Sequence, residues 1–181
     1  MAQSPAHTFG QIIGDVLERA VEPLIAELAE RHGLYWDKKG LRLARGGRKL
    51  SWVDLYGNTH ELDYVVERGG TERRVGVPVA FIEVAWRRYT KHSKNKAQEI
   101  QGAILPLVAT HRNVAPFTGA VVAGDFTASS LAQLRSQGFC VAHLPTETVL
   151  EAFKVVGIDA NYGEATPDAE VDLPSGCHSE R

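Results

Sequence analysis

The stretch GVPVAFIEVAW, residues 76–86, constrains the fold more than any other, because it has the length of a strand and almost no polar side chain. Such density is typical of a strand that is buried on both faces. A sheet with a strand of this kind needs helices against each of its faces. The sequence therefore predicts a sheet that lies between helical layers.

Helical and strand-like patterns alternate around this segment. Apolar spacing predicts a helix over residues 9–31, with a start at Thr8, a stop at Gly33, and a kink or division at Pro23. The further expected elements are strands at 50–57 and 60–67 before the central strand, a helix from Ser93 to about Thr110, a strand at 117–126, a helix at 127–138, a strand at 139–145 and a helix at 146–157. The first strands can pair as meanders, and the later ones need helical crossovers. This order predicts an α/β fold, a three-layer sandwich with a mixed central sheet.

Length and composition are those of one domain. With 181 residues, of which 44% are hydrophobic, the chain can bury a proper core over residues 1–159. Residues 160–181 are polar and acidic, and we expect a tail or linker there. No apolar run approaches the roughly 20 residues of a membrane span, and the N-terminus lacks the pattern of a secretory signal. The two cysteines form no disulfide framework, so a cytoplasmic location is expected.

The cations are unevenly distributed. The net charge is only −2, yet more than half of the 20 Lys and Arg residues fall in two windows without an acid, residues 38–49 and 87–96. This sorting is typical of a face that binds a polyanion, and the alternative is a pair of solvated loops.

Two acids interrupt the apolar strands. Glu83 shares its expected strand face with Phe81 and Ala85, and Asp63 shares one with Val65 on the preceding strand. If the two strands pair, both carboxylates meet above the sheet, where mutual repulsion favours a divalent cation. Mg²⁺ prefers one or two carboxylates completed by water and phosphate oxygens.

Basic residues follow Glu83 directly and suit a phosphodiester. The candidates for phosphate contact are Arg87, Arg88, Lys91 and Lys94. The expected helix start near Ser93 adds backbone N–H donors and a positive dipole end. A metal-bound water attacks phosphorus at neutral pH, and cations stabilise the transition state. The alternative is that Glu83 only forms a salt bridge at a strand end.

This pattern resembles the PD-(D/E)XK, or restriction-endonuclease-like, superfamily of nucleases. The resemblance rests on the order of elements and on two motifs, "ELDYVV" with Asp63 and "FIEVAW" with Glu83, and it covers residues 9–157. It implies a restriction-endonuclease-like core and a metal-dependent DNA endonuclease of restriction or repair type. It further implies that Asp63, Glu83 and the backbone carbonyl of Val84 bind Mg²⁺ or Mn²⁺.

One position departs from the family. Relatives usually carry Lys two residues after the acid, and this chain has Ala85. Either a cation from elsewhere supplies the charge, with Lys96 preferred over Lys94, or the site is inactive. Glu99 is a further candidate metal ligand, with the alternative that it pairs with Lys96.

Other candidates and functions stay open. Glu18 on the first helix can reach a metal in such a fold, and His92 can touch a phosphate, although each also suits a surface role. The alternative functions are a catalytically inactive DNA-binding module, which Ala85 favours, and an interaction protein without enzymatic activity. Small nucleases of this shape often act as homodimers, but no segment marks an interface.

Overall fold

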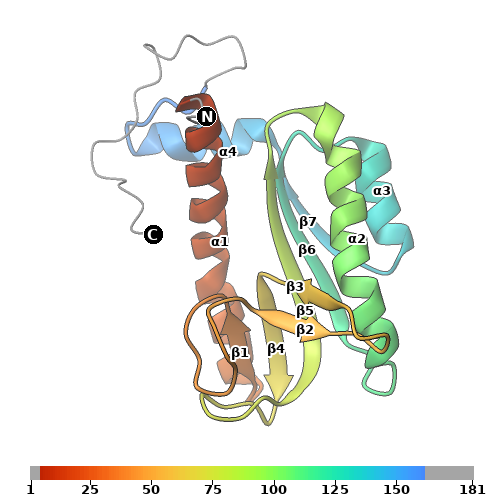
Figure 1. Cartoon of the computed structure of the whole chain (residues 1–181). Helices are drawn as coiled ribbons and strands as arrows, with labels where there is room; N and C mark the ends of the chain where they lie inside the picture. Colours follow the sequence, from red (N-terminus) through yellow and green to blue (C-terminus); the bar gives the residue numbers. More distant parts are fainter. Residues whose placement is uncertain (1–4, 162–181) are drawn as a thin grey trace.

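The computed structural model describes residues 5–161 and consists of a mixed sheet between two helical layers (Figure 1). The sheet has the strand order β1-β4-β5-β6-β7, in which β1, β4 and β5 are antiparallel and β5, β6 and β7 are parallel. Its strands are β1 (Tyr35–Lys38), β4 (Tyr64–Arg68), β5 (Val77–Arg87), β6 (Phe117–Gly124) and β7 (Cys140–Leu144). The predicted three-layer α/β sandwich with a mixed sheet is confirmed.

Helices cover both faces of the sheet. In Figure 1, α1 lies on one side, α2 and α3 lie on the other, and α4 crosses one end of the molecule. Their bounds are α1 (Pro5–Arg31), α2 (Ser93–Thr110), α3 (Ala128–Ser136) and α4 (Thr146–Val155), and a 3-10 turn, η1 (Thr90–His92), precedes α2. A separate hairpin is formed by β2 (Ser51–Val53) and β3 (Thr59–Glu61).

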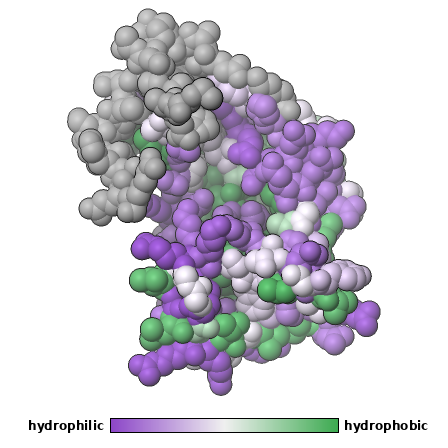
Figure 2. Space-filling view, in the orientation of Figure 1, coloured by the Kyte–Doolittle hydropathy of each residue, from purple (hydrophilic) through white to green (hydrophobic). Residues whose placement is uncertain are grey.

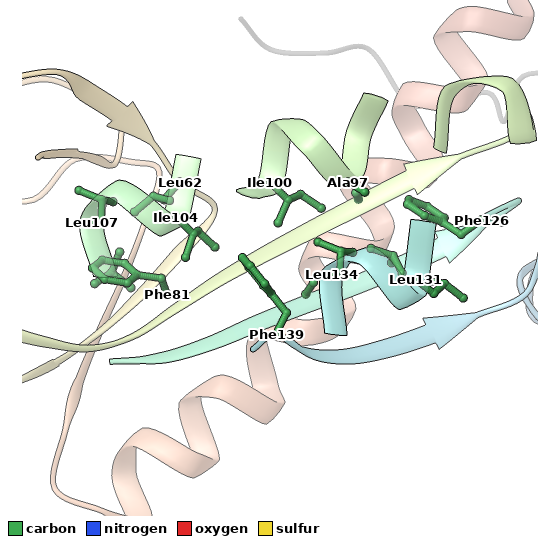
Figure 3. Packing of buried hydrophobic residues seen from close by; sticks show 14 of the residues in the cluster. Leu62, Phe81, Ala97, Ile100, Ile104, Leu107, Phe126, Leu131, Leu134 and Phe139 are labelled. Atoms are coloured by element: carbon green, nitrogen blue, oxygen red, sulfur yellow. The ribbon is translucent and has the colours of Figure 1, made fainter. Parts of the chain in front are cut away.

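The central strand β5 is buried on both faces, as predicted. On one face Phe81 and Ala85 belong to the core beneath α2 and α3, and on the other Val84 packs with Val21 and Ile25 of α1. Figure 3 shows the first of these cores, in which apolar side chains of α2 and α3 point toward the sheet. Its labelled members are Leu62, Phe81, Ala97, Ile100, Ile104, Leu107, Phe126, Leu131, Leu134 and Phe139.

Helix α1 runs through Pro23 without division. Proline removes one helical N–H, but Val21 and Ile25 on either side are buried against the sheet and hold the helix together. The predicted stop is confirmed: Gly33 has a left-handed φ of 63°, and the Leu34 N–H donates to the Ala29 carbonyl at 2.8 Å. No helix within residues 5–161 is long and apolar enough to cross a membrane.

The region before β5 differs from the expectation. The strand predicted at 60–67 is divided into β3 and β4, because the chain turns at Leu62 and Asp63. Leu62 therefore packs beneath α2 with Val65 rather than on the opposite face. Only three residues of the segment 50–57 form a strand, and they pair with β3 outside the main sheet. The edge strand β1, which pairs with β4, was not predicted.

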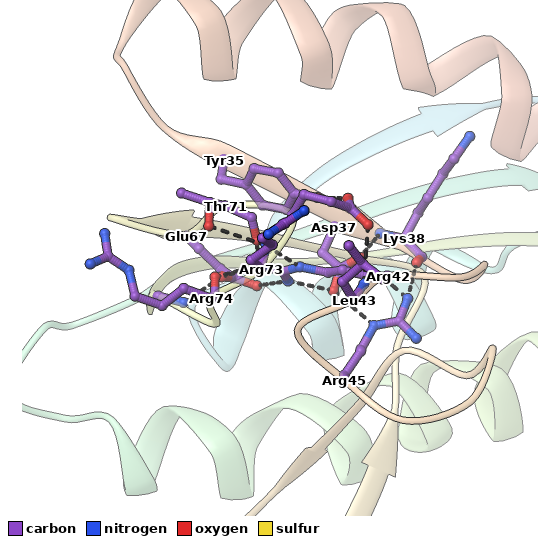
Figure 4. A network of polar contacts seen from close by, with 12 residues as sticks. Tyr35, Asp37, Lys38, Arg42, Leu43, Arg45, Glu67, Thr71, Arg73 and Arg74 are labelled. Atoms are coloured by element: carbon purple, nitrogen blue, oxygen red, sulfur yellow. Dashed lines mark hydrogen bonds and ion pairs between the residues drawn. The ribbon is translucent and has the colours of Figure 1, made fainter.

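The first basic window is not an open cationic surface. Arg42 is buried between two acids, donating to Asp37 at 2.7 Å and to Glu67 at 2.6 and 3.0 Å (Figure 4). Arg45 donates to Asp37 at 3.0 Å, and Lys49 pairs with an acid of β3. These contacts attach the loop after β1 to the sheet, so they neutralise cations that the sequence assigned to a polyanion-binding face.

The packed part of the chain extends past the predicted boundary at residue 159. Ala160 is buried in a cluster with Phe9, Ile13 and Trp86, and its carbonyl accepts a hydrogen bond from Arg88 at 2.8 Å. The remainder of the predicted tail, residues 162–181, lies outside the described residues.

The Arg42 cluster gives a prediction for stability. Arg42→Met leaves the buried Glu67 carboxylate without its partner, so we expect a loss of unfolding free energy of about 3–5 kcal/mol. Urea denaturation measures it, with the exposed Arg48→Met as the matched control, which should change little. Equal stability of the two variants would contradict a structural role for the cluster.

Candidate functional site

A cleft of about 1030 Å³ opens beside the end of β5. Strand β4 begins at Tyr64, opposite Ile82, so the last part of β5 has no antiparallel neighbour. Helix α1 and the first turns of α2 form the two walls. In the space-filling view, hydrophilic residues gather over the beginning of α2, and apolar atoms lie deeper beside them (Figure 2). The lining residues are Gly10, Gln11, Gly14, Asp15, Glu18, Asp63, Val84, Ala85, Trp86, Arg87, Arg88, Tyr89, His92, Asn95, Lys96 and Glu99.

The structure brings Asp63 and Glu83 together. The backbone N–H of Val84 donates to Asp63 Oδ2 at 2.8 Å, and the backbone N–H of Asp63 donates to Glu83 Oε1 at 3.3 Å. The strand register explains this exchange, because Asp63 directly precedes the Tyr64–Ile82 pair. Asp63 is half-buried and lines the cleft, whereas Glu83 is only 6% exposed and lies beneath its surface.

The environment of Glu83 favours its protonated form. Burial and then the charge of Asp63 raise the pKa of Glu83 to about 8, and the Lys96 ammonium partly opposes this rise. At neutral pH the carboxyl therefore retains a proton that a bound divalent cation would displace.

The wall formed by α2 carries Lys96, the cation that we preferred as the replacement for a lysine at position 85. Lys96 is largely buried and acts electrostatically on Glu83. Its Nζ lies 3.6 Å from Glu99 Oε2, and Arg87 Nη2 lies 3.6 Å from the same oxygen. Glu99 thus pairs with two cations. Within residues 5–161, no group of three or more His, Cys, Asp or Glu side chains is arranged to hold a metal.

The other predicted phosphate contacts are placed differently. Lys94 is exposed and does not line the cleft, whereas Arg87 and Arg88 are half-buried in its wall. His92 lies at the entrance of α2 and also lines the cleft. Lys91 belongs to η1, and its side chain lies outside what the structure describes.

The wall formed by α1 is acidic, and a lysine from the loop after β1 pairs with one of its acids. Asp15 and Glu18 line the cleft, and burial, followed by the charge of Asp63, raises the pKa of Glu18. Lys39 Nζ lies 3.3 Å from Glu18 Oε2, and its charge also acts on Asp63. Lys39 was part of the first basic window, but the pattern alone carries no signal for the direction of its side chain.

The donor set suits a hard divalent cation. Two adjacent carboxylates and the Val84 carbonyl provide only oxygen ligands, which Mg²⁺ prefers, and Mg²⁺ usually retains several waters. Burial first, and then the charge of Asp63, raise the pKa of Glu83, and a bound cation would oppose both effects. The residues present therefore fit the metal that the resemblance implies.

Comparison with known proteins gives little further information. Neither a family model nor a curated protein matches the chain. One crystal structure, described as a protein of unknown function, AF1548, is similar over 75% of this chain and 69% of its own, with 15% identity and a TM-score of 0.43. This likeness is too distant to support an argument about the site.

The raised pKa of Glu83 makes the stability of the metal-free protein depend on pH. The carboxyl titrates near 4.5 when unfolded and near 8 when folded, so the free energy of unfolding falls as the pH rises between these values. Glu83→Gln removes the titration, so at about pH 9 we expect this variant to exceed the wild type by on the order of a few kcal/mol.

Urea denaturation in a metal chelator at about pH 5 and about pH 9 tests this expectation. Glu99→Gln is the control, because Glu99 is exposed and should leave the pH dependence unchanged. A wild-type stability that did not fall between the two pH values would contradict the proposed environment of Glu83.

Proposed function

We propose that this protein is a metal-dependent DNA endonuclease that hydrolyses phosphodiester bonds. The observation that carries the proposal is the contact between Asp63 and Glu83 at the open end of β5. Cations lie next to this pair on the α2 wall. Residues of both α1 and α2 line the cleft. Two acids beside cations in one cleft suit a bound metal and a polyanionic substrate together.

The residues take distinct roles in this proposal. Asp63, Glu83 and the Val84 carbonyl would hold Mg²⁺ or Mn²⁺, which lowers the pKa of a bound water and polarises the phosphate when present. Asn95, in the first turn of α2, lines the cleft, and the start of a helix favours a phosphate oxygen. Because Asp15 and Glu18 make the α1 wall acidic and Asp63 lines the same cleft, substrate binding depends on the metal to reduce repulsion.

Lys96 is the residue that replaces the lysine missing at position 85. Its charge reaches Glu83, and its partner Glu99 is exposed, so the ammonium can turn toward a phosphate without leaving a buried acid unpaired. Lys39 approaches Asp63 from the opposite wall and is the second candidate for this role.

Cleavage assays on supercoiled plasmid test the proposal. We expect Asp63→Asn to reduce nicking in Mg²⁺ or Mn²⁺ by more than about a hundredfold, because the metal loses a ligand. Lys96→Met should reduce it by about a hundredfold, while the exposed Lys94→Met should cleave normally. Full activity of Asp63→Asn would show that the acid pair is not the active site.

A catalytically inactive DNA-binding module is the second candidate, and Ala85 is the observation that favours it. This candidate predicts duplex binding without cleavage in either metal. Binding should weaken with salt, because phosphate contacts release counterions.

The salt dependence locates the DNA surface in both cases. Arg87→Ala removes one half-buried cation of the cleft, so we expect the slope of log affinity against log salt to fall by about one. Fluorescence anisotropy with a labelled duplex measures the slope, and Arg48→Ala is a control outside the cleft. An unchanged slope for Arg87→Ala would exclude this wall from the interface.

A further inference from the structure

Two buried N–H donors in the cleft wall have no acceptor. Within residues 5–161, Trp86 Nε1 and Arg88 Nη1 are the buried side-chain atoms without a hydrogen-bond partner. Trp86 is only 7% exposed. Buried donors are almost always paired in native proteins, and leaving one unpaired costs about 1–3 kcal/mol. Two such donors in one wall therefore indicate a ligand acceptor that completes them.

Both donors lie beside the same backbone segment. Trp86 belongs to the same buried cluster as Ala160, and Arg88 Nη2 donates to the Ala160 carbonyl at 2.8 Å. The two residues are separated by one position at the end of β5, and both line the cleft. Both residues therefore border the same cleft, with their unpaired nitrogens buried behind its surface.

Arg88 is a cation without an ion pair in the part of the chain that the structure describes. No carboxylate within residues 5–161 forms an ion pair with Arg88, whereas Arg87 has Glu99. Burial lowers the pKa of Arg88, and the charges of Tyr89 and Asp125 only partly offset that effect. A half-buried guanidinium in this position favours an anion from solution.

The opposite wall leaves room for a ligand. Gly10 and Gly14 lie one turn apart on α1 and line the same cleft. A Cβ added to either glycine would meet no atom within 4 Å. A compact group can therefore enter between α1 and the end of β5.

We propose that Trp86 Nε1 and the Arg88 guanidinium form a subsite for a phosphate group, separate from the Asp63–Glu83 pair. Both residues are donors only, so the ligand supplies acceptors alone, and the guanidinium fork matches two phosphate oxygens. Because both nitrogens are covered, phosphate reaches them when the Ala160 carbonyl moves away from Arg88. On the proposed function, the source is the terminal phosphate of a nucleic-acid strand, and free inorganic phosphate offers the same chemistry.

Binding without a divalent metal separates this subsite from catalysis. Calorimetric titrations in a chelator use the full chain and three probes: a short single strand with a 5′-phosphate, the same strand without it, and inorganic phosphate. We expect the 5′-phosphate to tighten binding by about tenfold, the usual value of a charge-assisted hydrogen-bond pair. If inorganic phosphate binds but the 5′-phosphate does not tighten binding of the strand, the subsite exists and its ligand is the free anion.

Matched variants test the two donors. Trp86→Phe removes the indole N–H and keeps an aromatic ring, and Arg88→Met removes the guanidinium, so each should abolish the preference for the phosphorylated strand. Trp52→Phe and Arg87→Met are the controls and should retain the preference, even where Arg87→Met lowers overall affinity. Thermal melting confirms that each variant folds, and if Trp86→Phe does not fold, Arg88→Met decides.

The opposite results would overturn the proposal. In the first, the wild type binds both strands equally and binds no free phosphate. In the second, folded Trp86→Phe and Arg88→Met keep the preference for the phosphorylated strand. Greater stability of Trp86→Phe with unchanged binding would also overturn it, because the unpaired N–H would then be only a structural cost. None of these outcomes bears on plasmid cleavage, since the titrations contain no metal.

Discussion

The exchange of hydrogen bonds between Asp63 and β5 is the constraint on which the site depends. The strand ladder ends at Tyr64, and the Asp63 carboxylate then accepts the Val84 N–H that a further strand residue would have bonded. The Asp63 N–H is in turn satisfied by Glu83. One short side chain therefore ends the antiparallel pairing, leaves an open strand end for the cleft, and fixes the two acids against each other. Each carboxylate accepts a backbone N–H from the other acid's segment, so both backbone donors are satisfied by the acid pair.

Opposite charges surround this pair from both walls. Lys96 acts on Glu83 from α2, and Lys39 acts on Asp63 and Glu18 from the loop after β1. The position of Lys39 depends on the buried Arg42 cluster, since Arg42 and Arg45 attach that loop to Asp37. A cluster whose residues do not line the cleft thus contributes to its electrostatics. The same proximity of acids and lysines brings positive charge to the acid pair although position 85 is an alanine.

The sequence predicted what local patterns determine. The dense apolar strand β5, the spacing of α2 and the Gly33 stop each carry a direct signal, and the central strand was placed within one residue at each end. The four-residue strand β1 was missed because its polar residues continue into a basic loop. The division of the segment 60–67 depends on the tertiary bond from Val84 to Asp63, for which no local pattern exists. Lys94 and Lys96 are two residues apart, and only the rotation of α2 against the sheet decides that Lys96 reaches the cleft.

Because Arg42 is buried, the isoelectric point of the protein and its attraction for a polyanion depend on different side chains. The isoelectric point expected from the composition, about 6.4, counts every cation, whether it is enclosed or accessible, and so includes Arg42 and its acidic partners alike. A polyanion is attracted mainly by the charged groups that it can approach closely. Salt ions screen the attraction of more distant charges over about 10 Å. For this molecule the bulk titration behaviour and the attraction of a phosphate chain are governed by different sets of side chains, and chromatographic behaviour is a poor guide to the second.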